Sequence, residues 1–159
     1  MKKQFQDLPF RSGVGIIVLN KINKIFVAKR IDNPKKFWQM PQGGVDNGEN
    51  YYEAAIRELE EETSIKNVEL IKEIDGFISY ELPDYLLGII WRGRFKGQKQ
   101  KWFIMKFKGN DEEINIRTKK PEFFEWKWIG VEELTKVAVP FKMTVYKKLQ
   151  IEIKNILKN

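Results

Sequence analysis

The chain of 159 residues carries 29 lysines and arginines against 22 aspartates and glutamates, and it contains neither histidine nor cysteine. This composition excludes disulfides, thiol nucleophiles, zinc sites built from Cys and His, and serine triads, so any chemistry must rest on carboxylates, lysines, tyrosines or bound hard metals. The length fits a single domain. The formal net charge of +7 favours polyanionic ligands such as nucleotides or nucleic acid, with a solvated basic surface as the alternative.

Targeting and membrane segments are not predicted from this sequence. The N-terminal sequence MKKQFQDLPF has lysines but no apolar stretch after them, so it does not resemble a secretory signal. The longest apolar run, residues 85–91, is far shorter than the ~20 residues that span a bilayer. We therefore expect a cytoplasmic protein without membrane contact.

Runs of β-branched or alternating apolar residues predict the strands of the fold. The polar stretch at residues 96–100 is expected to connect two of them, and Trp38, Trp102 and Trp126 are assigned to the core. The predicted strands lie at residues 14–19, 24–30, 68–78, 86–92, 101–108 and 126–129.

Two helices are predicted from their caps and their periodicity. Asn50, followed three residues later by Glu53, predicts a helix N-terminus of the capping-box form, and residues 54–62 continue with good helix formers. From Phe141 onwards, apolar residues recur every three or four positions between lysines, which predicts an amphipathic C-terminal helix. Strands interleaved with two helices indicate an α+β fold with a mixed sheet between helical layers.

The first of these helices has an unusual acidic side. At roughly 100° per residue, Glu58, Glu61 and Glu62 fall close together, beside the apolar side that contains Leu59. Like charges at this spacing repel, and the helix macrodipole disfavours anions near a C-terminus. A bound divalent cation removes both penalties, because carboxylates are preferred ligands of Mg²⁺ and Mn²⁺. A solvated acidic face, partly compensated by Arg57, is the alternative.

Residues 43–65, GGVDNGENYYEAAIRELEEETSI, resemble the Nudix box, G-x5-E-x7-R-E-U-x-E-E-x-G-U, in which U is apolar. The departure is Ser64, where the family has a glycine that caps the helix in the left-handed conformation. We expect this serine to cost about 1 kcal/mol of local strain without removing a metal ligand. The matching residues are Gly43, Glu49, Arg57, Glu58, Leu59, Glu61, Glu62 and Ile65.

Four further segments resemble the Nudix branch that contains bacterial RNA pyrophosphohydrolases and dinucleoside polyphosphate hydrolases. They are WQMPQGG (38–44), GQKQKWF (97–103), PEF (121–123) and FKMTVY (141–146). The resemblance implies one Nudix hydrolase domain over residues 1–159, with the α/β/α sandwich of that family. It also implies hydrolysis of phosphoanhydride bonds by a metal-activated water.

The same resemblance implies two or more Mg²⁺ or Mn²⁺ ions as cofactors. Arg57 would orient a glutamate rather than touch substrate, and Glu49 would hold the loop before the helix. Whether Glu62 or Glu122 acts as the general base stays open. The implied catalytic residues are Arg57, Glu58, Glu61, Glu62 and Glu122, and the implied metal ligands are these four glutamates with the carbonyl of Gly43.

Several cations lie in segments where the family keeps phosphate contacts, although each, taken alone, would be an ordinary surface residue. Phe141 is expected either to stack on the first base of a substrate or to belong to the core, since its helical spacing fits both. The implied substrate-binding residues are Arg11, Arg30, Lys99, Lys101, Phe141 and Lys142.

Three functions remain in view at this point. The first is removal of pyrophosphate from the 5′-triphosphate end of RNA, leaving a 5′-monophosphate and initiating transcript degradation. The second is hydrolysis of diadenosine tetra- or pentaphosphate. The third is a non-catalytic RNA-binding module, which the retained glutamates disfavour because a binder of polyanions gains by losing them. The expected partners are these substrates, and no obligate protein partner is inferred.

Overall fold

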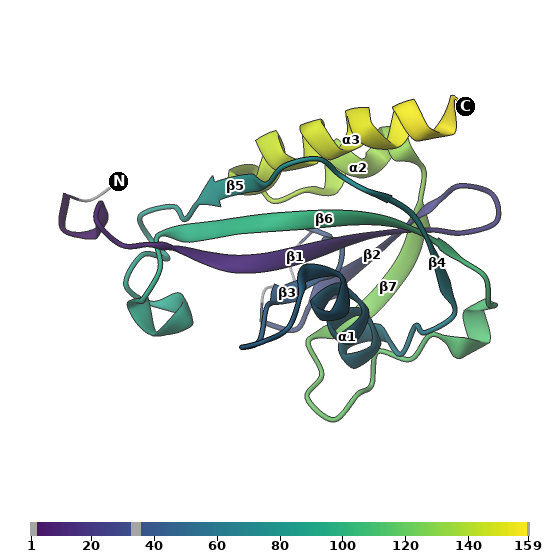
Figure 1. Ribbon diagram of the computed structural model, residues 1–159, viewed down its shortest axis with the longest axis horizontal. Coiled ribbons are helices and arrows are strands. Elements are labelled where there is room, and N and C mark those ends of the chain that lie inside the picture. The colour runs from purple at the N-terminus through teal and green to yellow at the C-terminus, as the bar shows by residue number, and fades with distance from the viewer. Residues whose placement is uncertain (1–2, 33–35, 159) are drawn as a thin grey trace.

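A mixed sheet forms the centre of the protein in the computed structural model, which describes residues 3–32 and 36–158 (Figure 1). The strands of the described part are β1 (Phe10–Leu19), β2 (Ile25–Arg30), β3 (Gln42–Gly44), β4 (Val68–Glu73), β5 (Ile78–Glu81), β6 (Gly97–Phe107) and β7 (Phe123–Ile129). They run in the order β4-β6-β1-β2-β7, while β3 pairs with β1 and β5 pairs with β6. The pairing of β1 with β6 is parallel and the others are antiparallel, which confirms a mixed sheet.

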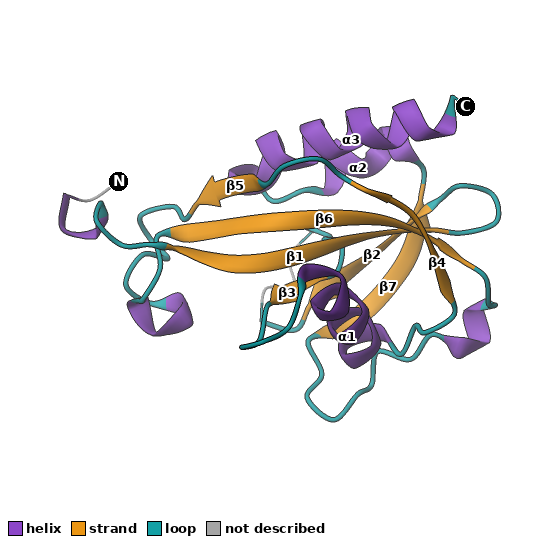
Figure 2. Cartoon of the chain, in the orientation of Figure 1, coloured by secondary structure: helices purple, strands orange, loops and turns teal. Residues whose placement is uncertain are grey.

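Helices cover both faces of this sheet. The α-helices of the described part are α1 (Tyr51–Thr63), α2 (Leu134–Val137) and α3 (Met143–Leu157). In Figure 2, α2 and α3 lie together on one side of the strands and α1 lies on the other. The predicted α+β class and the α/β/α sandwich are therefore confirmed.

The side chains of the central strand alternate between the two helical layers, as expected for a strand. Ile16 and Val18 lie in the buried cluster that contains Leu59 of α1. Ile17, between them, lies in the second cluster, with Leu149 of α3. The sheet thus has a core on each face, and both helices are held by apolar packing.

Most of the predicted elements are confirmed. The predicted strands at residues 14–19, 24–30, 101–108 and 126–129 correspond to β1, β2, β6 and β7. Asn50 caps α1, since its side-chain oxygen accepts a hydrogen bond from the Glu53 backbone N–H at 2.8 Å. The C-terminal helix is also present, preceded by the 3₁₀ turn Pro140–Lys142.

The predicted core tryptophans differ in burial. Trp38 and Trp102 are buried. Trp126 is only partly buried, and its ring stacks on Phe26 with centroids 5.6 Å apart. Among the described residues, no helix combines the length and the apolar character needed to span a bilayer.

The predicted strand at residues 86–92 is wrong. These residues form turns and the 3₁₀ segment Ile90–Gly93, in which Trp91 and Arg92 have left-handed φ angles of 51° and 57°. Gly88 and Gly93 also have positive φ, at 79° and 69°, which glycine adopts without steric cost. The apolar run resembles a strand in sequence, but these reversals bend it into a loop.

Two other boundaries were predicted wrongly. The polar residues 96–100 are not a connection, because β6 begins at Gly97 and carries Gln98 and Gln100 as buried residues. The predicted strand at residues 68–78 is broken into β4 and β5 by a bend at Asp75 and Gly76, where Gly76 has φ 72°.

Candidate active site

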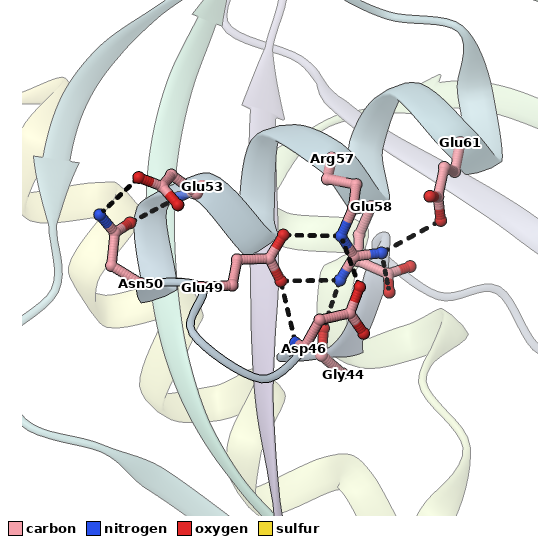
Figure 3. Close-up of polar contacts among 8 residues, drawn as sticks. All are labelled: Gly44, Asp46, Glu49, Asn50, Glu53, Arg57, Glu58 and Glu61. Atoms are coloured by element: carbon pink, nitrogen blue, oxygen red, sulfur yellow. Dashed lines mark hydrogen bonds and ion pairs between the residues drawn. The ribbon is translucent and has the colours of Figure 1, made fainter.

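Arg57 is the centre of the polar network around α1 (Figure 3). Its guanidinium donates to both carboxylate oxygens of Glu49, with Nε at 2.7 Å and Nη2 at 3.0 Å, and to the Gly44 carbonyl at 2.9 Å. On the other side, Nη1 lies 3.0 Å from Glu58 Oε1 and 3.1 Å from Glu61 Oε2. The hydrogen bond to Glu49 raises the pKa of Arg57 and lowers that of Glu49. One cation therefore ties the loop after β3 to two of the helix glutamates.

Glu58 lies against the backbone of β3. A Cβ atom at Gly43 would overlap the carboxyl group of Glu58, so a glycine is required for this close approach. Burial raises the pKa of Glu58, although the Arg57 hydrogen bond acts in the opposite direction. The carboxylate and the main chain of Gly43 thus lie side by side, as a shared ion site would require.

Glu62 is the most deeply buried of the glutamates, with 4% of its surface exposed. Its Oε2 atom has no hydrogen-bond partner among the described residues. Burial raises the pKa of Glu62 well above 4.5, and the nearby charges of Glu122 and Glu58 raise it further. An unpaired buried carboxylate is costly unless a cation compensates it, so this oxygen fits a metal ligand.

Glu122 reaches the same region from a distant part of the chain. It immediately precedes β7, and its backbone carbonyl accepts a hydrogen bond from Ile31 at 2.9 Å. Its Oε2 lies 3.5 Å from Arg30 Nη1, with 46% of the side chain exposed. Because its charge raises the pKa of both Glu58 and Glu62, three carboxylates interact here.

Glu61 is the most exposed of the four glutamates. Its side chain is 59% exposed and is paired with Arg57. In the described part of the chain, no three acidic side chains approach closely enough to form a ready metal cluster. Arg57 Nη1 binds one oxygen of Glu58 and one of Glu61, and it thereby holds these two carboxylates near each other.

A second polar group lies on the face of the sheet that α3 covers. The sequence analysis did not predict this group. Gln98 Nε2 donates to the Tyr80 hydroxyl at 2.8 Å, and Gln100 Nε2 donates to Gln42 Oε1 at 3.1 Å. Lys142 Nζ donates to the same Gln42 oxygen at 3.2 Å. The spacing of two between Gln98 and Gln100 was the available signal, since it places both on one face of a strand.

Lys142 is an unusual lysine because it is buried with no carboxylate ion pair in the described part of the chain. It is 7% exposed, and its ammonium lies 5.3 Å from the ring of Tyr80 and 5.9 Å from that of Phe141. Burial lowers its pKa to about 7. Phe141 itself packs against the core and lies 5.9 Å from Tyr80, so it borders the site while contributing to the fold.

The two predicted arginines lie near this group. Arg11 donates to Gln98 Oε1 at 3.2 Å, and its guanidinium lies so close to Gly44 that a Cβ there would overlap it. Arg30 forms a bidentate ion pair with Asp32, in which Nε and Nη2 each donate to a carboxylate oxygen at 2.7 Å. The Asp32 hydrogen bond raises the pKa of Arg30 and lowers that of Asp32.

The structure does not bring Lys99 and Lys101 to these arginines. Lys101 donates to the Gly76 carbonyl at 3.0 Å and lies 3.7 Å from Glu73. Lys99 is exposed, with its ammonium 4.9 Å from the ring of Phe77. Both side chains thus contact the bend between β4 and β5.

Ser64 ends α1 in the left-handed conformation that the glycine of the Nudix box would adopt, with φ 66° and ψ 7°. Its backbone N–H donates to the Glu60 carbonyl at 2.9 Å, and its hydroxyl donates to the Asn115 carbonyl at 2.8 Å. The side-chain hydrogen bond offsets part of the strain, so the helix ends as the motif requires.

The fold and the glutamate helix agree with a family comparison. A family model described as the NUDIX domain matches residues 9–149. The chain therefore belongs to the NUDIX family and is a metal-dependent hydrolase of phosphoanhydride bonds. Nudix hydrolases generally use divalent metal ions.

Similar proteins carry one recurring name. The RNA pyrophosphohydrolase of Pelagibacter ubique is 69% identical over 151 residues, which cover 95% of this chain and 96% of the relative. That of Rhodospirillum rubrum is 48% identical over 146 residues, covering 92% and 88%. Among solved structures, the E. coli dihydroneopterin triphosphate pyrophosphohydrolase matches with a TM-score of 0.69 and 19% identity over 91% of this chain and 99% of that one, which shows the shared fold alone.

Proposed function

We propose that this protein is an RNA pyrophosphohydrolase, which removes pyrophosphate from the 5′-triphosphate end of RNA and leaves a 5′-monophosphate, thereby initiating transcript degradation in the cytoplasm. The whole chain of 159 residues would act as one domain. The observation that carries the hydrolytic part is the buried, unpaired carboxylate oxygen of Glu62 beside Glu58 and Glu122. The RNA substrate is supported by relatives of that name at 69% and 48% identity.

The donor set suits Mg²⁺ or Mn²⁺, because these ions prefer carboxylate and carbonyl oxygens. We propose that two or more ions bind here. When bound, they would lower the pKa of a water molecule and neutralise charge on the leaving pyrophosphate. The residues that would hold them are Gly43, through its carbonyl, with Glu58, Glu61, Glu62 and Glu122.

The protein's own groups position the reactants and take up the proton. Water forms a bond to a phosphorus atom of the anhydride, and the bond to the leaving pyrophosphate breaks. Glu62 is buried and suits ion binding, which leaves the half-exposed Glu122 better placed to accept the water's proton. Arg57 is a positioning residue, since it fixes the orientation of Glu58 and Glu61.

The triphosphate requires cations in addition to metal. In the described part, Lys142 has no carboxylate partner and Arg11 donates its hydrogen bond to a neutral amide, so we propose that both bind phosphate oxygens. Arg30 would have to exchange its Asp32 contact for substrate. The half-buried Phe141 borders these groups and would stack on the first base.

A second candidate is hydrolysis of dinucleoside polyphosphates. The aromatic pair Tyr80 and Phe141 favours it as much as RNA, because a stacked adenine needs only a ring face. The C. elegans Ap4A hydrolase shares the fold, with a TM-score of 0.63 at 20% identity. Rates on 5′-triphosphorylated RNA and on diadenosine pentaphosphate, measured side by side in Mg²⁺, test the proposal. A far higher kcat/KM for the diadenosine compound would reverse the order of the two functions.

Divalent metal is expected to raise the melting temperature of the wild type, because an ion that binds only the folded site stabilises it by mass action. At 100 times the Kd this contribution is about 2.7 kcal/mol. The measurement compares thermal denaturation in EDTA with that in millimolar MgCl₂, and NaCl of equal ionic strength is the control. Identical transitions in all three would show that the free enzyme has no preformed ion site.

A further inference from the structure

The connection between β5 and β6, residues 82–96, forms a closed loop beside the candidate active site. The Leu82 N–H donates to the Lys96 carbonyl at 2.8 Å and closes its base, while Leu82 and Leu87 are buried in the core under α3. Figure 1 shows this loop at the end of the sheet where β1 and β6 begin. The loop is thus anchored to the core by its buried leucines and by the hydrogen bond at its base.

A chain of contacts connects the loop to the catalytic residues. Arg57 binds the Gly44 carbonyl, and the guanidinium of Arg11 packs against Gly44. The Arg11 guanidinium carbon lies 5.4 Å from the centroid of the Trp91 ring. Trp91 therefore borders the same arginine that is available to the triphosphate.

The loop is locally strained at this point. Trp91 and Arg92 are consecutive non-glycine residues in the left-handed region. This conformation is unfavourable for residues with a side chain, and strain of this kind persists at functional sites where neighbouring contacts enforce it. Here it directs Trp91 toward Arg11 while Arg92 stays exposed.

The exposed surface of the loop is basic and partly aromatic. Within the segment, three basic residues stand against one acidic residue, Asp84. Arg92 and Arg94 are exposed, and neither forms an ion pair with any described residue. Tyr85 is 68% exposed. Arginines that have no ion pair among the described residues, in the same loop as an accessible aromatic ring, match the chemistry of single-stranded RNA, which offers phosphates and stackable bases.

We propose that this loop binds the RNA nucleotides that follow the 5′ end, with Arg92 and Arg94 pairing to their phosphates. The inference rests on the proposed function, because it requires an RNA chain that continues out of the site. A dinucleoside polyphosphate has no such phosphates. The loop would thus favour long RNA over short triphosphorylated substrates.

The test uses the full chain in Mg²⁺ with two 5′-triphosphorylated RNAs of the same starting sequence, a dinucleotide and a decamer. The variant is Arg92→Asn with Arg94→Gln, since asparagine tolerates the left-handed conformation. The control is Lys147→Gln with Lys148→Gln on α3, which removes the same charge from two exposed lysines that have no ion pair among the described residues. Melting curves of all three proteins establish that each is folded.

We expect the wild type to prefer the decamer. In the arginine variant, kcat/KM for the decamer should fall by roughly 5- to 30-fold, because two exposed phosphate pairs contribute about 1 to 2 kcal/mol together. The dinucleotide should lose no more than it does in the lysine control. Binding of a decamer with a 5′-hydroxyl should also lose about 1.4 from its salt slope, since each phosphate contact on a single strand contributes about 0.7.

Two results would overturn the inference while leaving the proposed function intact. One is an equal loss on both RNA lengths, and the other is an equal loss in the lysine control. A wild type that cleaves neither RNA but cleaves diadenosine pentaphosphate would overturn the proposed function and this inference with it.

Discussion

Replacing Glu62 by glutamine is expected to lower kcat by at least ~10²-fold in Mg²⁺, because the substitution removes an anionic ligand whose free oxygen has no other partner among the described residues. Steady-state rates on triphosphorylated RNA measure this effect. Glu60→Gln is the matched control, since Glu60 lies on the same helix but pairs outward with Lys66 at 3.5 Å. Near-normal turnover by the Glu62 variant would remove this residue from the ion site.

The same substitution should stabilise the metal-free protein. Burial raises the folded-state pKa of Glu62 well above 4.5, so the wild type loses stability as pH rises from the unfolded value through the raised one. Glutamine does not titrate. In EDTA, the gain in free energy of unfolding over the wild type should therefore be small near pH 4 and should grow toward neutral pH. Urea denaturation across this range measures it, and a variant less stable than the wild type at pH 7 would contradict the account.

The glutamate helix could be predicted from sequence because its determinants are local. Asn50 and Glu53 set its beginning, and the spacing of Glu58, Glu61 and Glu62 follows from helical geometry. Helical geometry does not reveal which segment covers the end of the helix. Asn115, far along the chain, donates its backbone N–H to the Thr63 carbonyl at 2.9 Å, and at this end of the helix Glu62 is buried while Glu61 stays exposed.

The glutamine group was missed for a related reason. Gln98 and Gln100 read as a polar connection, since buried amides are unfavourable without partners. Their partners, Tyr80 and Gln42, come from other strands and meet them only after the sheet has formed. The polarity of this segment therefore wrongly predicted a connection where the strand β6 begins.

The strand predicted within the loop at residues 82–96 was wrong for the opposite reason, because here an apolar segment was taken for a strand. Its apolar run satisfies the pattern of a strand, but Leu87 is buried under α3 while Ile89 is 68% exposed on the far side of the Gly88 bend. A glycine within an apolar run permits a reversal without requiring one. The burial of the leucines in the core favours a loop over a strand in this segment.

Lys142→Met is expected to raise stability at pH 7 and to weaken substrate binding. The lysine is buried with its pKa lowered to about 7 from 10.5, which means that the folded protein releases a proton that the unfolded chain retains. Wild-type stability therefore falls as pH drops from about 10.5 to about 7 and is not reduced further by this group below that. Methionine has similar length and no charge, so it avoids this cost and packs well beside Tyr80.

The stability gain of Lys142→Met should be largest at and below pH 7 and should shrink toward pH 10, as measured by urea denaturation. KM for triphosphorylated RNA should rise by roughly 10- to 100-fold, because a hydrogen bond to a charged group contributes about 1.5 to 3 kcal/mol. Lys148→Met, on the exposed side of α3, should change neither quantity. A Lys142 variant that is less stable than the wild type at pH 7 would mean that the fold stabilises the ammonium. An unchanged KM would mean that the triphosphate does not reach Lys142, and its charge would then have to be met by Arg11 and Arg30 with the metal.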